Sequence, residues 1–156
     1  MRTLLISGFG LSLVLFASAA FSEDKADKDK EAKLVCPISG EAIDKDVSAD
    51  FNGGKVCFCC ADCKAKFEKD NTKYAAKANL QLAASGQAKQ AACPFSGGTI
   101  KASTAVKVAG VEGQFCCDNC KAKVAAAKPD EQIRLVFDSK PFAKAFKVGK
   151  EGEKDK

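Results

Sequence analysis

The sequence lacks three residue types that metal sites and active sites often use. It contains no histidine and no tryptophan, and its single methionine is Met1. Without histidine the chain has no imidazole ligand and no histidine general base. Without a methionine after Met1, the rest of the chain has no thioether ligand. A site for a soft metal must therefore use cysteine ligands, and a carboxylate is the remaining side-chain ligand that could assist them.

The charge pattern is modest and evenly mixed. The chain has 25 basic and 20 acidic residues, a formal net charge of +5. The lysines are scattered and do not form a stripe with interleaved aromatic residues, which a nucleic-acid surface would favour. The sequence therefore predicts a solvated lysine surface and no nucleic-acid partner.

Residues 1–22 match a secretory signal peptide. Arg2 precedes an apolar run over residues 4–16, and small residues follow it. The run is shorter than the roughly 20 residues that span a bilayer, which argues against a membrane anchor. Cleavage after Ala19 or after Ser22 fits the pattern. We therefore expect a bacterial protein that is periplasmic or secreted and has no membrane contact after cleavage.

Two charged segments flank the rest of the chain. Residues 23–33 and 148–156 have dense mixed charge and almost no apolar anchor. Such segments cannot bury enough apolar surface to fold, so we predict a disordered linker and a disordered tail. The residues between them divide into a first module, 34–86, and a second module, 87–147.

An internal repeat defines these modules. A shift of 57 residues (93 − 36) places CPISG at 36–40 on CPFSG at 93–97. The same shift places CCADC at 59–63 on CCDNC at 116–120, with no gap. Each CC pair follows a phenylalanine, and each CCxxC precedes the sequence KAK. Four cysteines in register without an insertion indicate a true tandem repeat.

Each module has the same predicted local plan. The CPxSG motif predicts a tight turn, because proline fixes one dihedral angle and glycine permits a positive one. In the first module a hairpin is expected over residues 47–59, with its turn at NGG, residues 52–54. In the second module Val106 leads into Gly110, and the chain returns through Phe115. CCxxC then opens a helix with an acidic residue in its first turn.

The segments after the two CCxxC motifs differ between the modules. Residues 71–84 have the periodicity of a second helix. Pro129 breaks the corresponding part of the second module, and residues 132–137 fit either a strand or a short helix. A helix start follows, and it turns Phe142 and Phe146 inward as core residues.

The cysteine spacing favours convergence of four sulfurs in each module. Cys60 and Cys63 are three residues apart and share one face of the expected helix. Cys59 precedes that helix, and Cys36 arrives from the turn. Four sulfurs suit a closed tetrahedral zinc site, and a helix N-terminus favours thiolates. We predict about two ions per chain and no catalytic residue. The predicted ligands are Cys36, Cys59, Cys60, Cys63, Cys93, Cys116, Cys117 and Cys120.

Disulfide bonding is the main alternative, because nine cysteines in an exported protein suggest structural disulfide bonds. Neighbouring cysteines cannot bond to each other without ring strain, but Cys36–Cys59 with Cys60–Cys63 is a possible pairing. A thiol–disulfide oxidoreductase is a third reading, although CxxC lacks the βαβ context of that class. The ninth cysteine, Cys57, is either a spare ligand or a packed or free thiol.

At these cysteines the sequence resembles the YHS and TRASH group of small treble-clef-like metal-binding domains. The resemblance covers about residues 34–76 and 91–130. It is carried by three cysteines with 22 and then three intervening residues in each module, and by the phenylalanine before the second cysteine. A Lys73-Tyr74 pair resembles the end of such a module.

The resemblance implies a knuckle, a β-hairpin and a helix around a thiolate site. The expected fold is therefore α+β, with two small treble-clef-like modules in tandem and extra helices. Members are linked to heavy-metal sensing, trafficking or resistance, with zinc or copper as the usual ions. The Tyr-His-Ser motif is absent here. Ser39 and Ser96 stand where many members have a second knuckle cysteine, and we expect Cys60 and Cys117 to replace that ligand.

The sequence thus predicts an exported, non-enzymatic protein that binds heavy metal at one thiolate site per repeat. Zn(II) is the first choice. Cu(I) is the second, because it suits a site with only three thiolates. The expected role is structural or metal-handling, and the expected partners are metal ions and an envelope protein. The alternative function is a disulfide-stapled extracytoplasmic interaction module without metal.

Overall fold

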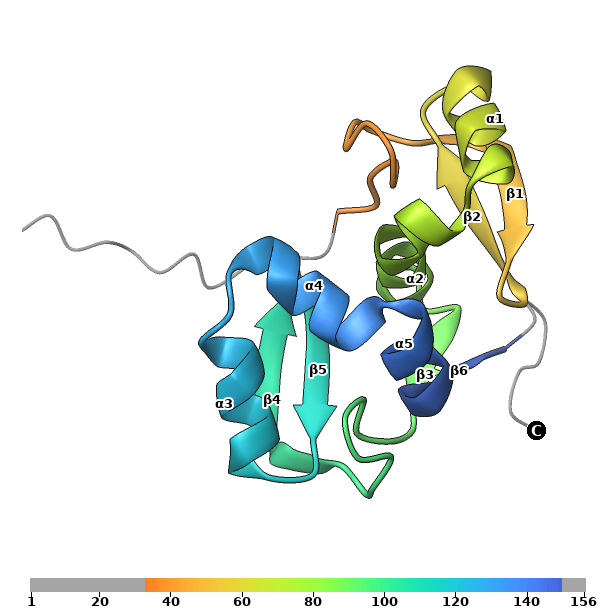
Figure 1. Ribbon diagram of the computed structural model, residues 1–156. Helices are drawn as coiled ribbons and strands as arrows, with labels where there is room; N and C mark the ends of the chain where they lie inside the picture. Colours follow the sequence, from red (N-terminus) through yellow and green to blue (C-terminus); the bar gives the residue numbers. More distant parts are fainter. Residues whose placement is uncertain (1–32, 150–156) are drawn as a thin grey trace, which may run out of the picture.

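The computed structural model of the protein describes residues 33–149. The predicted signal peptide lies outside this range, as do nearly all of the predicted linker and tail. Within the range the protein is α+β, as predicted from the sequence, with small β-hairpins and five α-helices. Figure 1 shows the two hairpins at opposite ends of the molecule, with helices between them. None of the helices in this part of the chain is long and apolar enough to cross a membrane.

The first module contains a hairpin, a 3₁₀ turn and two α-helices. Its elements are β1 (Asp44–Phe51), β2 (Gly54–Phe58), α1 (Ala61–Lys69), η1 (Thr72–Tyr74) and α2 (Ala75–Ala84). Asn52 and Gly53 form the hairpin turn with φ angles of 52° and 88°. Two positive φ angles in succession are what a type I′ turn requires, and this turn matches the twist of the paired strands. The hairpin and both helices predicted for this module are confirmed.

The second module repeats the hairpin and the first helix, and it adds two helices. Its elements are β3 (Ala88–Gln90), β4 (Lys101–Val108), β5 (Val111–Phe115), α3 (Asp118–Ala125), α4 (Pro129–Phe137), α5 (Ser139–Ala145) and β6 (Phe146–Val148). Ala109 and Gly110 form the hairpin turn with φ angles of 48° and 88°. The two hairpins therefore share one turn geometry, although the first module uses asparagine where the second uses alanine.

The segment that fitted either a strand or a helix is helical. Residues 132–137 belong to α4, which has Pro129 in its first turn. Proline is tolerated there because the first N–H groups of a helix have no intrahelical acceptor, and its φ is already helical. Pro129 thus interrupts the chain after α3, as predicted, and begins a new helix.

The C-terminal part of the described chain is ordered further than the sequence predicted. Asp138 caps α5 by accepting a hydrogen bond of 2.8 Å from the Ser139 N–H. Phe142 and Phe146 are buried and stacked with their ring centroids 4.9 Å apart, which confirms that they face inward. Val148 was assigned to the tail, but it pairs with Ala88 in the β3–β6 ladder.

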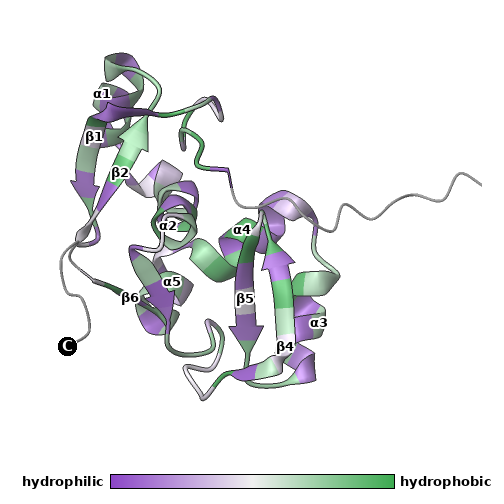
Figure 2. Ribbon diagram, turned by 180° about the vertical axis from the view of Figure 1, so that it is seen from behind, coloured by the Kyte–Doolittle hydropathy of each residue, from purple (hydrophilic) through white to green (hydrophobic). Residues whose placement is uncertain are grey.

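One hydrophobic core connects the two modules. Helix α2 of the first module packs against α4 of the second, and α4 and β5 carry hydrophobic segments in the middle of the molecule (Figure 2). The largest fully buried side chains come from both modules and include Phe58, Phe67, Leu82, Phe115 and Phe137. Burial of one such side chain contributes about 1.5–3 kcal/mol, so the shared core holds the modules together.

A buried asparagine adds polar contacts at this junction. The Asn79 side chain is completely buried and donates a hydrogen bond of 2.9 Å to the Phe137 carbonyl of α4. Its own oxygen accepts a hydrogen bond of 2.7 Å from the Asn52 side chain in the hairpin turn. Asn79 therefore connects the first hairpin to the second module, and the two modules pack as one unit.

Candidate metal centres

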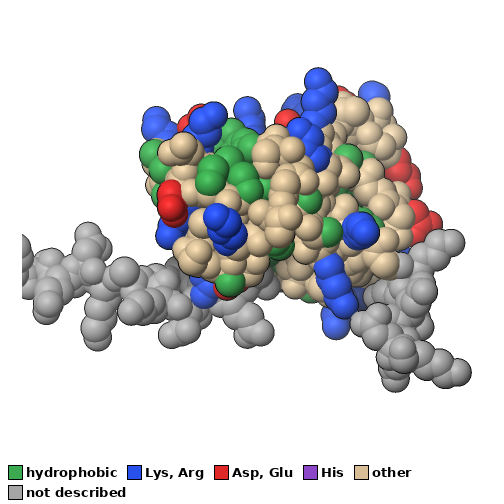
Figure 3. Space-filling view, turned by 90° about the horizontal axis from the view of Figure 1, so that it is seen from below, with side chains coloured by type: hydrophobic (Ala, Val, Ile, Leu, Met, Phe, Trp, Pro, Cys, Tyr) green, Lys and Arg blue, Asp and Glu red, His purple; other side chains and the backbone are tan. Residues whose placement is uncertain are grey.

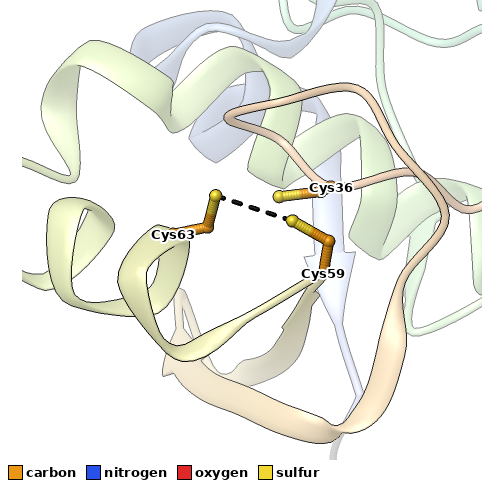
Figure 4. Close-up of side chains that lie close together, drawn as sticks. All are labelled: Cys36, Cys59 and Cys63. Atoms are coloured by element: carbon orange, nitrogen blue, oxygen red, sulfur yellow. Dashed lines mark hydrogen bonds between the residues drawn. The ribbon is translucent and has the colours of Figure 1, made fainter.

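Each module brings three cysteine sulfurs together. The sulfurs of Cys36, Cys59 and Cys63 all lie within 4.8 Å of one another, and the Cys59 and Cys63 sulfurs are 3.6 Å apart. Figure 4 shows these side chains converging from three segments: a turn, the residue after β2 and the first turn of α1. We refer to this group as the first triad.

The second module contains an equivalent group. The sulfurs of Cys93, Cys116 and Cys120 also lie within 4.8 Å of one another. The Cys116 and Cys120 sulfurs are 3.8 Å apart. We refer to this group as the second triad. Because a shift of 57 residues relates its members to those of the first triad, the sequence repeat is also a repeat of the site.

A tight turn positions the first cysteine of each triad. The Gly40 N–H donates to the Cys36 carbonyl over 2.9 Å, and the Cys36 N–H donates to the Glu41 carbonyl over 2.8 Å. Gly40 has a φ of 79°, in the left-handed region that favours glycine. Cys93 and Gly97 repeat the first of these bonds over 2.8 Å. The turn predicted for CPxSG is confirmed in both modules.

The sulfur separations match those expected around a single metal ion. Zinc binds a thiolate sulfur at about 2.3 Å, so two sulfurs on one tetrahedral zinc lie about 3.8 Å apart. The Cys59–Cys63 and Cys116–Cys120 pairs are separated by 3.6 Å and 3.8 Å, and the other pairs of each triad lie within 4.8 Å. Each triad can therefore hold a metal ion.

Six of the eight predicted ligands form the triads, and Cys60 and Cys117 lie beside them. Cys60 is the N-cap residue of α1, and its exposed sulfur is 3.7 Å from that of Cys59. Cys117 is the N-cap residue of α3, and its sulfur lies 3.8 Å from Cys116 and 3.7 Å from Cys120. Both sulfurs are next to a triad, but neither is within 4.8 Å of every member.

The ninth cysteine belongs to neither triad. Cys57 lies in β2, where its side chain is half-buried. The eight cysteines of the two CPxSG and CCxxC motifs form no disulfide in the structure. Their shortest sulfur separations, 3.6–3.8 Å, are well above a disulfide bond length of about 2.05 Å.

The knuckle serines contact the sulfur sites through their hydroxyl groups. The Ser39 hydroxyl lies 3.2 Å from the Cys59 sulfur, and the Ser96 hydroxyl donates to the Cys116 sulfur over the same distance. The Ser39 hydroxyl lowers the pKa of the Cys59 thiol, but burial and the Cys60 and Cys36 thiols outweigh it, so the net shift of that pKa is upward. Sequence reasoning treated these serines only as missing ligands. Their position two residues after proline in both modules was the signal that they act together with the cysteines.

Backbone hydrogen bonds favour the thiolate at the first cysteine. Burial raises the pKa of the Cys36 thiol, but three backbone N–H groups outweigh burial and lower the pKa to about 6. These groups belong to Ser39, Cys59 and Ile38. The pKa of Cys93 is also about 6, since burial is again outweighed by the corresponding N–H groups of Ser96, Cys116 and Phe95. The turn therefore prepares an ionised ligand, which metal binding requires.

The third cysteine of each triad has the opposite tendency. Burial raises the pKa of the Cys63 thiol to about 12, and the neighbouring thiols add to the rise. The pKa of Cys120 is raised to about 12 for the same reasons. One triad therefore holds a thiolate beside a thiol that keeps its proton. A bound metal cation would take the place of that proton, because coordination deprotonates a thiol outright.

The N-cap cysteines are favoured as thiolates by their helix ends. The pKa of Cys60 is lowered, chiefly by the backbone N–H of Cys63. The pKa of Cys117 is lowered, chiefly by the N–H of Cys120. Neither side chain makes a capping hydrogen bond to its helix. The positive end of each helix therefore stabilises a thiolate beside the triad.

The first lysine after each CCxxC motif contacts another group of its own module. Lys64 lies 3.9 Å from Glu68 in an exposed ion pair, which contributes little to stability. The Lys121 ammonium donates to the Ser103 carbonyl at 3.5 Å. On the face shown in Figure 3, basic side chains are spread over the surface and do not form a stripe.

Comparison of the chain with protein-family models, curated proteins and solved structures found no match. The resemblance to the YHS and TRASH group therefore stays a prediction that rests on the cysteine spacing. The geometry itself establishes two cysteine clusters that can bind metal.

The lowered pKa values predict a titration of the metal-free, reduced protein. Cys36 and Cys93 should ionise near pH 6 and not near the usual thiol value of 9.0. Because the folded pKa lies below the unfolded one, the two thiolates stabilise the fold fully above about pH 9. This stabilisation is lost as the pH falls through about 6.

The measurement is a pH titration of the ultraviolet absorbance of thiolates. Two thiolates per chain should appear near pH 6, and Cys36→Ser should remove one of them. Cys57→Ser is the matched control, since Cys57 lies outside both triads. This variant should still show both thiolates near pH 6. Ionisation of all the thiols together near pH 9 would contradict the assignment.

Proposed function

We propose that the protein is an exported, non-enzymatic heavy-metal-binding protein with one thiolate site in each module. The observation that carries the proposal is the pair of cysteine triads at equivalent positions of the repeat. Cysteine thiolates select soft metals such as Zn(II) and Cu(I). A chain without histidine has no other strong soft-metal ligand available at these positions.

Zn(II) is the ion that we favour. Zn(II) prefers four tetrahedral ligands, and the Cys117 sulfur already lies at tetrahedral distances from Cys116 and Cys120. Cys60 lies at a similar distance from Cys59. With these two cysteines as fourth ligands, each site would contain four thiolates. Cu(I) is the second choice, and it would bind the triads alone.

The role is structural or metal-handling. Each module is small, and a structural metal contributes on the order of 10 kcal/mol to the folding of such modules. The similarity of the cysteine spacing to YHS and TRASH domains favours metal handling in the bacterial envelope. The proposed partners are therefore metal ions and a periplasmic or secreted protein that exchanges them. The disulfide-stapled module without metal is the competing function.

We predict that the purified protein contains about two metal ions per chain, one for each triad. Its thiols should resist alkylation until a strong chelator is added, because coordinated thiolates are poor nucleophiles. The measurements are elemental analysis of the protein and intact-mass analysis after alkylation. A metal-free protein whose mass is lower by about 2 Da for each disulfide formed would contradict the proposal and favour the alternative.

The fourth-ligand assignment has its own test. Cys60→Ser should abolish one equivalent of Zn(II) and leave the second site intact. Cys57→Ser is the matched control, and it should keep two equivalents because Cys57 lies outside both triads. If Cys60→Ser keeps two equivalents with unchanged affinity, the site uses the triad alone, and Cu(I) becomes the preferred ion.

A further inference from the structure

A glutamine side chain bridges the two cysteine-bearing segments of the first module. The Gln81 amide nitrogen donates to the carbonyls of Val35 and Cys57, both over 2.9 Å. Its oxygen accepts a hydrogen bond of 2.7 Å from the Cys57 N–H. Val35 immediately precedes Cys36, and Cys57 lies two residues before Cys59. Gln81 thus fixes the turn that carries Cys36 to the strand that leads to Cys59.

A second glutamine makes the same three bonds in the second module. The Gln90 amide nitrogen donates to the Ala92 carbonyl over 3.0 Å and to the Gln114 carbonyl over 2.6 Å. Its oxygen accepts from the Gln114 N–H over 2.8 Å. Ala92 immediately precedes Cys93, and Gln114 lies two residues before Cys116. The bond pattern at the two triads is therefore identical.

The two glutamines are not related by the sequence repeat. A shift of 57 residues places Gln81 on Asp138, and the reverse shift places Gln90 on Lys33. Gln81 comes from α2, whereas Gln90 comes from β3. The backbone groups that they bridge do correspond under the shift, since 35 + 57 is 92 and 57 + 57 is 114. Two different elements therefore supply the same carboxamide to the same place.

The bridges act on the geometry of the triads. The first cysteine of each triad comes from a turn, and the other two come from the strand end and the helix. Only contacts between these segments can hold the three sulfurs within 4.8 Å. Gln81 is 5% exposed, and a hydrogen bond is stronger in such a low-dielectric setting than at the surface. Its three bonds therefore hold the turn firmly in register with β2.

We propose that Gln81 and Gln90 are positioning residues that hold the first cysteine of each triad at binding distance and so raise its metal affinity. This inference rests on the proposed metal-binding function. Residues that orient metal ligands typically change affinity by about 10–100-fold when they are replaced. The three hydrogen bonds of each glutamine go to backbone groups, so their effect would act through the backbone of the turn and strand.

The test uses Gln81→Met and Gln90→Met, because methionine keeps the length of the side chain and removes its hydrogen bonds. Gln87→Met is the matched control. Gln87 bonds to Lys55 of β2 through the same two-way pattern, over 2.7 Å and 2.9 Å. No bond joins Gln87 to the turn that carries Cys36 among the hydrogen bonds of the described residues.

Zn(II)-loaded protein is titrated with a chelator, and the cysteines released at each step are mapped by alkylation and mass spectrometry. Gln81→Met should weaken the Cys36 site about 10–100-fold and leave the Cys93 site unchanged. Gln90→Met should do the reverse, and Gln87→Met should change neither. Thermal unfolding of the metal-free variants reports any general loss of stability, which would not select one site.

The outcomes separate the two proposals. If the unaltered protein binds no metal, the proposed function fails and the positioning role fails with it. If it binds two ions and both glutamine variants release them like the unaltered protein, only the positioning role is overturned. Equal weakening of both sites by each variant would also overturn it, because that result reports general destabilisation. If Gln81→Met does not fold, Gln90→Met decides by the same criteria.

Discussion

The convergence of three sulfurs from three separate segments is the constraint on which each module depends. A turn delivers one sulfur, the end of a strand delivers the second, and the first turn of a helix delivers the third. Burial and, after it, the neighbouring thiols raise the pKa of Cys63, so the metal-free site keeps a proton there while Cys36 ionises. A soft cation would coordinate all the sulfurs of a triad at once and so stabilise each of them as a thiolate. The proposed metal is therefore the partner for which the arrangement of sulfurs is suited.

The rest of the fold holds these sites in place. Each hairpin lies at one end of the molecule with helices between them (Figure 1), and strands and helices of both modules contribute to the shared core. Gln81, which bonds to the backbone beside Cys36 and Cys59, lies in α2, the same helix that packs against α4 of the second module. Gln90 lies in β3, which pairs with the C-terminal strand β6. The support of the first site thus belongs to an element that also joins the modules.

Local and repeated features of the structure were predictable from the sequence, and long-range features were not. The CPxSG motifs predicted the turns at Gly40 and Gly97. The 57-residue repeat predicted that the two modules have equivalent cysteine clusters. The positions of Cys60 and Cys117 depend on the extended backbone of an N-cap residue, with φ near −160°, which residue spacing does not encode. The glutamine bridge of the first module spans 24 to 46 residues, and the two glutamines that make the bridges do not correspond under the repeat. Residues 132–137 were ambiguous because apolar residues in a short segment fit both a strand and a helix.

X-ray absorption spectroscopy at the zinc edge of the Zn(II)-loaded protein tests the central claim most directly, because it reports which atoms contact the ion and at what distance. We predict a first shell that contains only sulfur at about 2.3 Å, as expected for cysteine thiolates. The chain has no histidine that could add a nitrogen ligand. A first shell dominated by oxygen or nitrogen at about 2.0–2.2 Å would contradict the account, since the ion would then lie outside the cysteine triads.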